Sequence, residues 1–364
     1  MPQIGKLSGI KVIDLSQFLP GPMLTVMMAD HGAEVIKVEP AAGDPARTQG
    51  PFENGQSVWF ANLNRGKRSI VLDLKSEPGK AALTELIRNA DVFVEGFRPG
   101  VMARLGFGWP DVRALNPRIV YCSISAFGQT GALAQHPAHD MAVQAMAGFI
   151  SVNDAGDGQP PVVPGVPAAD VAAGLTGLGA VLMALIGRER TGQGDYVDIA
   201  MYDSLLPWCA HIAGGALAGG AAPRSSGQRS LGGAAFYNVY ECADGRHVVL
   251  GGREVKFAAA LLTALGRPDL IALAEAEAGE AQAPLAAFLR KTFRARSRDA
   301  WDAFMHDLDV AYAPVLDFAE AFAMPHVAER GLIVAADGRH HIAPAIRFAG
   351  DGWTPGEVPE LGQG

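Results

Sequence analysis

The feature that most constrains this fold is the alternation of short β-rich runs with helical stretches in the first third of the chain. The runs GIKVIDL, AEVIKVE, SIVLDL and DVFVEGF are separated by stretches of helical character near residues 23–29 and 79–89. Strands joined through helices pair in parallel, because the crossover returns the chain to the same edge of the sheet. Two later runs, PRIVYCSIS and DYVDIA, continue the pattern. The sequence therefore predicts an α/β fold with a mainly parallel sheet.

The length of 364 residues favours two domains. Residues 221–236, AAPRSSGQRSLGGAAF, are rich in turn formers and poor in large apolar residues, as linkers are. The following stretch, FYNVYECADGRHVVLGG, contains two β runs joined by an Ala-Asp-Gly turn, and we expect it to open the second domain.

The composition excludes some classes of protein. A net charge of −8, without a stripe of Lys and Arg, argues against nucleic-acid binding. Residues 204–223 are uncharged but glycine-rich and contain a proline, so we expect a buried helix leading into a linker and no membrane span. Three separated cysteines and an N-terminus without an apolar leader favour the cytoplasm.

The glycines at 174, 177 and 179 do not form a dinucleotide-binding motif. Their order is GxxGxG, not GxGxxG, and no strand directly precedes them. The small residues of this segment instead predict a helix that another backbone can approach closely.

Asp170 stands immediately before this small-residue helix, and two roles are open for it. An aspartate there can accept a hydrogen bond from the amides of the first turn and act as a cap. A helix N-terminus can equally hold an ionised carboxylate that serves as a nucleophile or base. Spacing alone favours the cap and does not separate the two.

Three other titratable residues have a structural interpretation, and the histidines among them also have a chemical one. His139, beside Asp140 in HPAHDMAVQAMAG, suits a loop or cap position, or a proton carrier near neutral pH. His136 has the same neighbourhood, but no third ligand at a suitable spacing predicts a metal site. Glu254 in GGREVKF suits an exposed cap before a helix.

Basic residues gather near strand ends. Arg65, Lys67 and Arg68 precede one β run, and Arg98 follows another. They can be paired with acidic neighbours such as Asp73 and Glu95 or form a cradle for an anion at the carboxyl edge of a parallel sheet.

The order of these motifs resembles the class III CoA-transferase family, also called the carnitine dehydratase and bile-acid-inducible F family. The resemblance rests on VIDLSQFLPGPMLTVMMADHGAEVIKVEP, NRGKRSIVLDLK, VEGFRPGVMARLGFG, YCSISAFGQTG, PGVPAADVAAGL and RERTGQGDYVDIAMYDS, and covers nearly the whole chain. The family includes formyl-CoA transferases and α-methylacyl-CoA racemases.

The resemblance implies two competing activities. In the transferases, the aspartate matched by Asp170 attacks the donor thioester and then carries CoA as an aspartyl-CoA thioester, which an acceptor carboxylate intercepts. In the 2-methylacyl-CoA racemases, the matched aspartate works as a base with a histidine, here His139, and with a glutamate, here Glu254. We expect CoA transfer first and racemisation second, with a non-catalytic acyl-CoA-binding relative as a third possibility.

The resemblance also implies an architecture and a set of ligands. It implies a Rossmann-like large α/β domain at 1–200 and 306–364, a linker at 201–224, a small α/β domain at 225–305, and an interlocked homodimer. The substrates would be an acyl-CoA thioester and a carboxylic acid, without a metal. Expected CoA contacts are Arg98, Lys67, Arg65, Arg68, Phe97 and Gly128. Leu19 stands where formyl-CoA and oxalyl-CoA transferases have glutamine, which argues against oxalate.

Overall fold

The computed structural model describes residues 5–154, 159–349 and 352–364, which form two compact units. Unit 1 comprises Met1–Ala147, Gly165–Trp208 and Met324–Gly364. Unit 2 comprises Gly148–Pro164 and Cys209–Ala323.

The centre of unit 1 is a six-stranded sheet in which every neighbouring pair is parallel. The strand order is β5 (Lys67–Val71), β2 (Glu34–Glu39), β1 (Lys11–Asp14), β6 (Val92–Glu95), β7 (Val120–Ser125) and β8 (Tyr196–Ala200). The prediction of a mainly parallel sheet is confirmed. The chain reverses its direction of travel across the sheet between β1 and β6, which is where folds of this class bind ligands.

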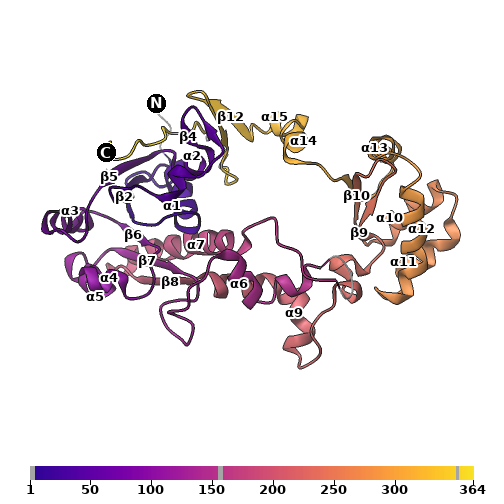
Figure 1. Cartoon of the computed structure of the whole chain (residues 1–364), viewed down its shortest axis with the longest axis horizontal. Helices are drawn as coiled ribbons and strands as arrows, with labels where there is room; N and C mark the ends of the chain where they lie inside the picture. Colours follow the sequence, from indigo (N-terminus) through magenta and orange to yellow (C-terminus); the bar gives the residue numbers. More distant parts are fainter. Residues whose placement is uncertain (1–4, 155–158, 350–351) are drawn as a thin grey trace. The chain divides into compact units, whose positions relative to one another are not determined.

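Helices cover both faces of this sheet (Figure 1). On one face, α3 (Glu77–Arg88), α4 (Val101–Leu105) and α5 (Trp109–Leu115) enclose an apolar core with the strands. On the other face, α1 (Pro20–Asp30) packs against α7 (Ala168–Thr191). Short apolar strands buried on both sides are typical of such a three-layer fold.

Local sequence explains where α3 begins and which side it buries. The Ser76 hydroxyl accepts a hydrogen bond from the Gly79 amide at 3.1 Å, which caps the first turn. Leu83 and Ile87, four residues apart on one face of the helix, are fully buried against the sheet.

Small residues let α1 approach α7 closely, as the sequence predicted for this helix. A Cβ atom at Gly174 would lie 2.9 Å from the Pro20 carbonyl oxygen, and one at Gly177 would lie 2.8 Å from Leu24. The helix that uses this space is α1 of the same unit. Among the described residues, α7 is also the one helix long and apolar enough to cross a membrane, with a mean hydropathy of 1.9 over its most apolar 18 residues. A buried core helix can be equally long and apolar, and the buried contacts of α7 with α1 are those of a core helix.

Further short elements complete unit 1. They are β3 (Phe52–Glu53), β4 (Gln56–Ser57), α2 (Val58–Asn64), α6 (Asp140–Met146), α8 (Met201–Leu205), α15 (Pro325–Glu329), β12 (Ile333–Ala336) and β13 (Arg339–Ile342).

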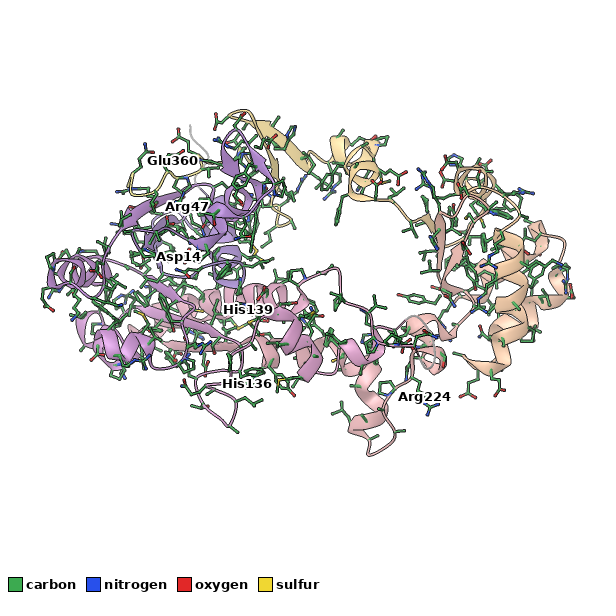
Figure 2. The ribbon with its side chains drawn as sticks, viewed as in Figure 1. Asp14, Arg47, His136, His139, Arg224 and Glu360 are labelled. Atoms are coloured by element: carbon green, nitrogen blue, oxygen red, sulfur yellow. The ribbon has the colours of Figure 1, made fainter. Side chains whose placement is uncertain are left out.

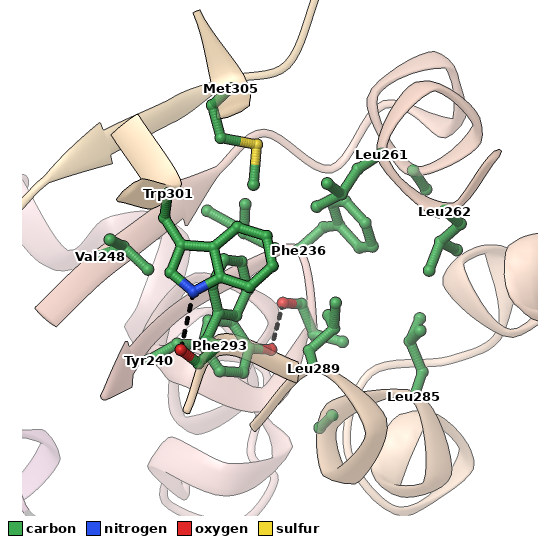
Figure 3. Close-up of a cluster of buried hydrophobic side chains, with 14 of the residues drawn as sticks. Phe236, Tyr240, Val248, Leu261, Leu262, Leu285, Leu289, Phe293, Trp301 and Met305 are labelled. Carbon is green, nitrogen blue, oxygen red and sulfur yellow. Dashed lines mark hydrogen bonds between the residues drawn. The ribbon is translucent and has the colours of Figure 1, made fainter. Parts of the chain in front are cut away.

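Unit 2 packs helices on a small antiparallel sheet. Its strands are β9 (Tyr237–Glu241), β10 (His247–Gly251) and β11 (Tyr312–Pro314), and its helices are α9 (Ala210–Leu217), α10 (Val255–Ala264), α11 (Ile271–Glu275), α12 (Ala283–Phe293), α13 (Arg298–Met305) and α14 (Phe318–Phe322). The β9–β10 hairpin agrees with the predicted pair of β runs. Trp301 lies at the core and donates a hydrogen bond from Nε1 to the Phe293 carbonyl at 2.7 Å (Figure 3).

Three expected boundaries differ from the structure. Gly148–Pro164, expected in the large domain at 1–200, belongs to unit 2. Residues 306–323, expected in the large domain, belong to unit 2 because β11 pairs with β10. The expected linker at 201–224 contains α8 and α9, and α9 buries none of its residues, so the prediction of a buried helix at 204–223 is wrong for its second half. Periodicity alone does not reveal which side chains another element will cover.

Candidate active site

A pocket of about 560 Å³ opens at the carboxyl ends of β1, β6 and β7. Residues 16–18 follow β1, residues 96–99 follow β6, and residues 124–126 end β7. The remaining walls include residues 136–139 and Asp170 on α7. The pocket therefore lies at the point where the strand order reverses, which is the expected ligand site of an open parallel sheet.

Asp170 is the third residue of α7 and is not the cap that spacing favoured. The cap is Asp140, whose Oδ1 accepts hydrogen bonds from the amides of Ala169 at 2.8 Å and Asp170 at 3.1 Å. Asp140 is itself held by Gln144, which donates to Oδ2 at 2.6 Å. In the described part of the chain, no group donates a hydrogen bond to the Asp170 carboxylate. The carboxylate is left available to a ligand in the pocket.

The surroundings of Asp170 favour its neutral form. Burial and the neighbouring Asp140 carboxylate raise the pKa of Asp170 to about 7. A carboxylate of raised pKa is more basic and more nucleophilic once it is ionised, and such perturbed groups cluster at functional sites.

His139 and His136 both line this pocket with Asp170. His139 directly precedes α6, and its ring meets the Phe18 ring edge to face with centroids 6.2 Å apart. The His136 ring lies 5.7 Å from that of Phe127. Figure 2 labels both histidines, which belong to the segment between β7 and α6. The site thus brings a carboxylate and imidazoles to one cavity.

Arg98 and Phe97 also line the pocket, on the loop after β6. Arg98 is exposed, and no carboxylate of the described residues lies within ion-pair distance of its guanidinium. The loop is anchored by Glu95, whose Oε2 accepts a hydrogen bond from the Phe97 amide at 2.8 Å while Ser123 donates to Oε1. Burial raises the pKa of Glu95 to about 7 although both of these bonds favour its charged form. An unpaired cation on an anchored loop suits an anionic ligand.

The other expected basic contacts have partners within the protein. Lys67 is fully buried, with Nζ 3.1 Å from Asp14 and 2.8 Å from the Thr25 hydroxyl. Arg65 is buried in a two-bond pair with Asp30, at 2.6 and 3.0 Å. The anion cradle expected from these two residues is therefore not formed, because their charges are satisfied inside unit 1.

Arg68 and Gly128 lie outside the pocket lining. Arg68 is exposed on the edge strand β5, and its guanidinium lies 3.4 Å from the Glu34 carboxylate on β2. Gly128 has a φ of 81° in the turn after β7, where the next amide, that of Gln129, donates to Asp198 at 3.0 Å. A residue with a side chain is disfavoured at that φ, so the backbone conformation of this turn explains why the residue is glycine.

Glu254 belongs to unit 2. It is exposed at the start of α10 and lines a pocket of about 460 Å³ with Arg229, Arg253 and Tyr237. Its predicted position before a helix is confirmed, and its catalytic role stays a prediction.

Sequence reasoning missed two parts of this site. The sequence shows Asp140 only as a neighbour of His139, yet Asp140 caps a helix that begins 28 residues later. The sequence also carries no sign of the wall formed by residues 16–18, where Phe18 has a φ of 62°, rare for a residue with a side chain. Neither feature has a local signal, because both depend on contacts between distant segments.

In the described residues, no group of three or more His, Cys, Asp and Glu side chains is arranged to hold a metal ion.

Comparison with known proteins gives consistent matches along the chain. The model of CoA-transferase family III matches residues 7–363. The acetyl-CoA:oxalate CoA-transferase of Acetobacter aceti is 38% identical, over 92% of this chain and 87% of its own length. The succinyl-CoA:glutarate CoA-transferase of Homo sapiens is 33% identical, over 96% of this chain and 82% of its own.

The fold has a solved counterpart as well. The crystal structure of a CAIB/BAIF family protein from Brucella suis superposes with a TM-score of 0.87 at 32% identity, covering 99% of this chain and 97% of that one.

Proposed function

The chain belongs to CoA-transferase family III, and we propose that it moves CoA from an acyl-CoA thioester to a free carboxylic acid through a thioester formed on Asp170. The observation that carries this proposal is the position of the Asp170 carboxylate. It lines a pocket at the point where the strand order of the sheet reverses. Asp140, and not Asp170, accepts the hydrogen bonds that cap α7.

The proposed reaction has two symmetrical halves. The Asp170 carboxylate attacks the donor thioester carbonyl. CoA departs as a thiolate, and a mixed anhydride between the acyl group and Asp170 remains. The thiolate then attacks the aspartyl carbonyl of that anhydride, so the donor departs as a carboxylate and Asp170 holds CoA as a thioester. The acceptor carboxylate attacks this thioester and expels the thiolate again. Attack of the thiolate on the acceptor carbonyl forms the new acyl-CoA and restores Asp170.

The neighbours of Asp170 support this sequence. Arg98 offers its unpaired cation to the phosphates of CoA, and Phe97 offers an aromatic ring on the same loop.

Both relatives described above are named for dicarboxylate acceptors, oxalate and glutarate. We therefore propose a dicarboxylic acid as the acceptor class. The relative named for oxalate weakens the exclusion of oxalate that Leu19 implied.

We also propose an interlocked homodimer that works in the cytoplasm. Met183 and Ile186 on α7 are 74% and 66% exposed, and such apolar side chains suit contact with a second copy. Cys122 and Cys242 are buried thiols that form no disulfide among the described residues, which fits a reducing compartment. Sedimentation over a dilution series tests the dimer, and a stable folded monomer would contradict it.

Racemisation of 2-methylacyl-CoA is the second candidate, because His139 lines the same pocket as Asp170 and could act as the opposing base. In that reaction Asp170 would carry a proton and would never be acylated.

One experiment separates these candidates. The protein is mixed with succinyl-CoA and glutarate, then with hydroxylamine, and Asp170 is examined by mass spectrometry while α-proton exchange is followed in deuterated water. We expect a hydroxamate at Asp170, loss of transfer in Asp170→Asn and retained transfer in His139→Ala. Asp203→Asn, a change at an exposed aspartate of α8, serves as the matched control.

Two other results would overturn the proposal. Deuterium entry that His139→Ala abolishes, without an adduct, would establish the racemase. Tight acyl-CoA binding without exchange or transfer, across a panel of thioesters and acids, would establish a non-catalytic binding protein.

A further inference from the structure

A network of buried charges lies directly behind the pocket wall formed by residues 16–18. The Lys37 ammonium is 2.8 Å from the Asp44 carboxylate, and both side chains are fully inaccessible to solvent. Asp14, labelled in Figure 2, is also fully buried in unit 1. Buried charges are costly to desolvate, and a pair of them contributes little net stability compared with apolar side chains of similar volume. Their contacts show what else they do.

Several polar atoms of this network bond to the backbone of the pocket wall, and Asp44 Oδ1 also caps residues 45–48 by accepting from the Ala46 amide at 2.9 Å. Lys37 Nζ donates to the Ser16 carbonyl at 2.9 Å. Asp44 Oδ1 accepts from the Phe18 amide at 3.4 Å. From the other side, Asp14 Oδ1 accepts from the Ser16 amide at 2.9 Å and from its hydroxyl at 2.5 Å. Backbone groups at both ends of the wall are thus held by charged side chains.

The wall needs this support because its conformation is unfavourable in isolation. Phe18 has a φ of 62°, in the left-handed region that a side chain disfavours. Such conformations persist only where the surrounding structure fixes them, and they gather at functional sites. The Phe18 ring lies against His139 on one side and Trp59 on another, with centroids 6.2 Å apart in each case.

From these contacts, and resting on the proposed function, we infer that Lys37 and Asp44 are positioning residues. They hold Ser16–Phe18 in the strained arrangement that places the acyl group opposite the Asp170 carboxylate. Neither residue lines the pocket, so neither touches the substrate. Because reacting atoms must be held closely, a small displacement of this wall lowers turnover more than it lowers binding of CoA.

The test compares two double variants. Lys37→Met with Asp44→Asn removes the charges together, keeps an acceptor for the Phe18 amide, and removes the donor to Ser16. The matched control is Asp91→Asn with Arg188→Met, which removes another ion pair of the same unit, and among the described residues neither side chain bonds to residues 16–18. Steady-state transfer of CoA from succinyl-CoA to glutarate is measured for both.

We expect the Lys37 and Asp44 double variant to lose about 10- to 100-fold in kcat with the succinyl-CoA KM changed less than about twofold. The control variant should keep its kcat even where its melting temperature falls. Equal losses in the two variants, or an unchanged kcat in the first, would overturn the inference. If the double variant does not fold, Asp44→Asn alone is measured, with a smaller loss in kcat expected and an unchanged kcat again contradicting it.

A crystal structure of the Lys37 and Asp44 variant separates this inference from the proposed function. We expect Phe18 to leave the left-handed region or to become disordered while Asp170 keeps its position. A wall unchanged from the wild type would refute the positioning role. Absence of CoA transfer in the wild type, with a displaced wall in the variant, would refute only the proposed function.

Discussion

Replacing Asp170 by asparagine is expected to stabilise the protein at neutral and higher pH while abolishing CoA transfer. Asparagine has the shape of aspartate but carries no charge, so it avoids burying a carboxylate beside Asp140. At a helix cap the same substitution would change the stability little, because asparagine caps a helix about as well as aspartate does. A clear gain in stability therefore distinguishes a carboxylate held in an unfavourable setting from a structural cap.

The size of the effect follows from the titration of this group. Its pKa rises from 3.8 to about 7 on folding, which sets a ceiling of about 4 kcal/mol at 1.36 kcal/mol for each pH unit. Asp170 keeps partial contact with solvent, which screens its charge, so we expect a gain of about 1–2 kcal/mol. That corresponds to a rise in melting temperature of about 2–6 °C.

The pH dependence of the stability difference between the wild type and Asp170→Asn tests the sign of that difference independently. At pH 4 and below, the carboxyl is protonated in the folded chain and no more than about 60% ionised in the unfolded chain, so the two proteins should melt nearly alike. As pH rises towards 7, the unfolded chain ionises at Asp170 before the folded chain does, and the wild type loses stability relative to Asp170→Asn. Above about pH 7 the difference is constant.

Thermal unfolding followed by circular dichroism at pH 4, 6 and 8 measures this difference. Asp203→Asn serves as the control, and other carboxylates cancel because they titrate alike in both proteins. A lower melting temperature for Asp170→Asn at pH 8, or the same difference at pH 4 and pH 8, would refute the reasoning.

Three further predictions concern the supports of the site and the core of unit 2. Asp140→Ala should lower the free energy of unfolding by about 1–2 kcal/mol in urea titrations, because two amides of α7 lose their acceptor; an unchanged midpoint would contradict the capping role. Arg98→Ala should raise the acyl-CoA KM more than it lowers kcat, whereas Arg68→Ala should change neither; equal losses in kcat and kcat/KM for Arg98→Ala would exclude a simple binding role. Trp301→Ala should lower the free energy of unfolding in urea titrations by about 3–5 kcal/mol. Trp301→Phe, which loses only part of the ring and the hydrogen bond to Phe293, should lower it clearly less.

Much of unit 1 follows from local sequence. Runs such as GIKVIDL and DVFVEGF alternate with helical stretches, and this pattern predicts the parallel sheet and therefore the edge at which ligands bind. Arg98 could be placed near that edge for the same reason, because it follows a β run closely. The site in unit 1 could thus be located before its geometry was known.

The roles of individual charges depended on tertiary structure. Asp170 and Asp140 are both acidic residues at helix starts, and only the packing of α6 against α7 makes Asp140 the cap of the second helix. Lys67 and Arg98 are both basic residues near strand ends, yet Lys67 is buried against Asp14 and Arg98 is exposed. The boundary of unit 2 likewise depends on β11 pairing with a strand some 60 residues earlier. Local sequence determines strands and helices through short-range preferences and periodicity. Burial and charge pairing depend on which distant segments meet, and that is decided only when the whole chain packs.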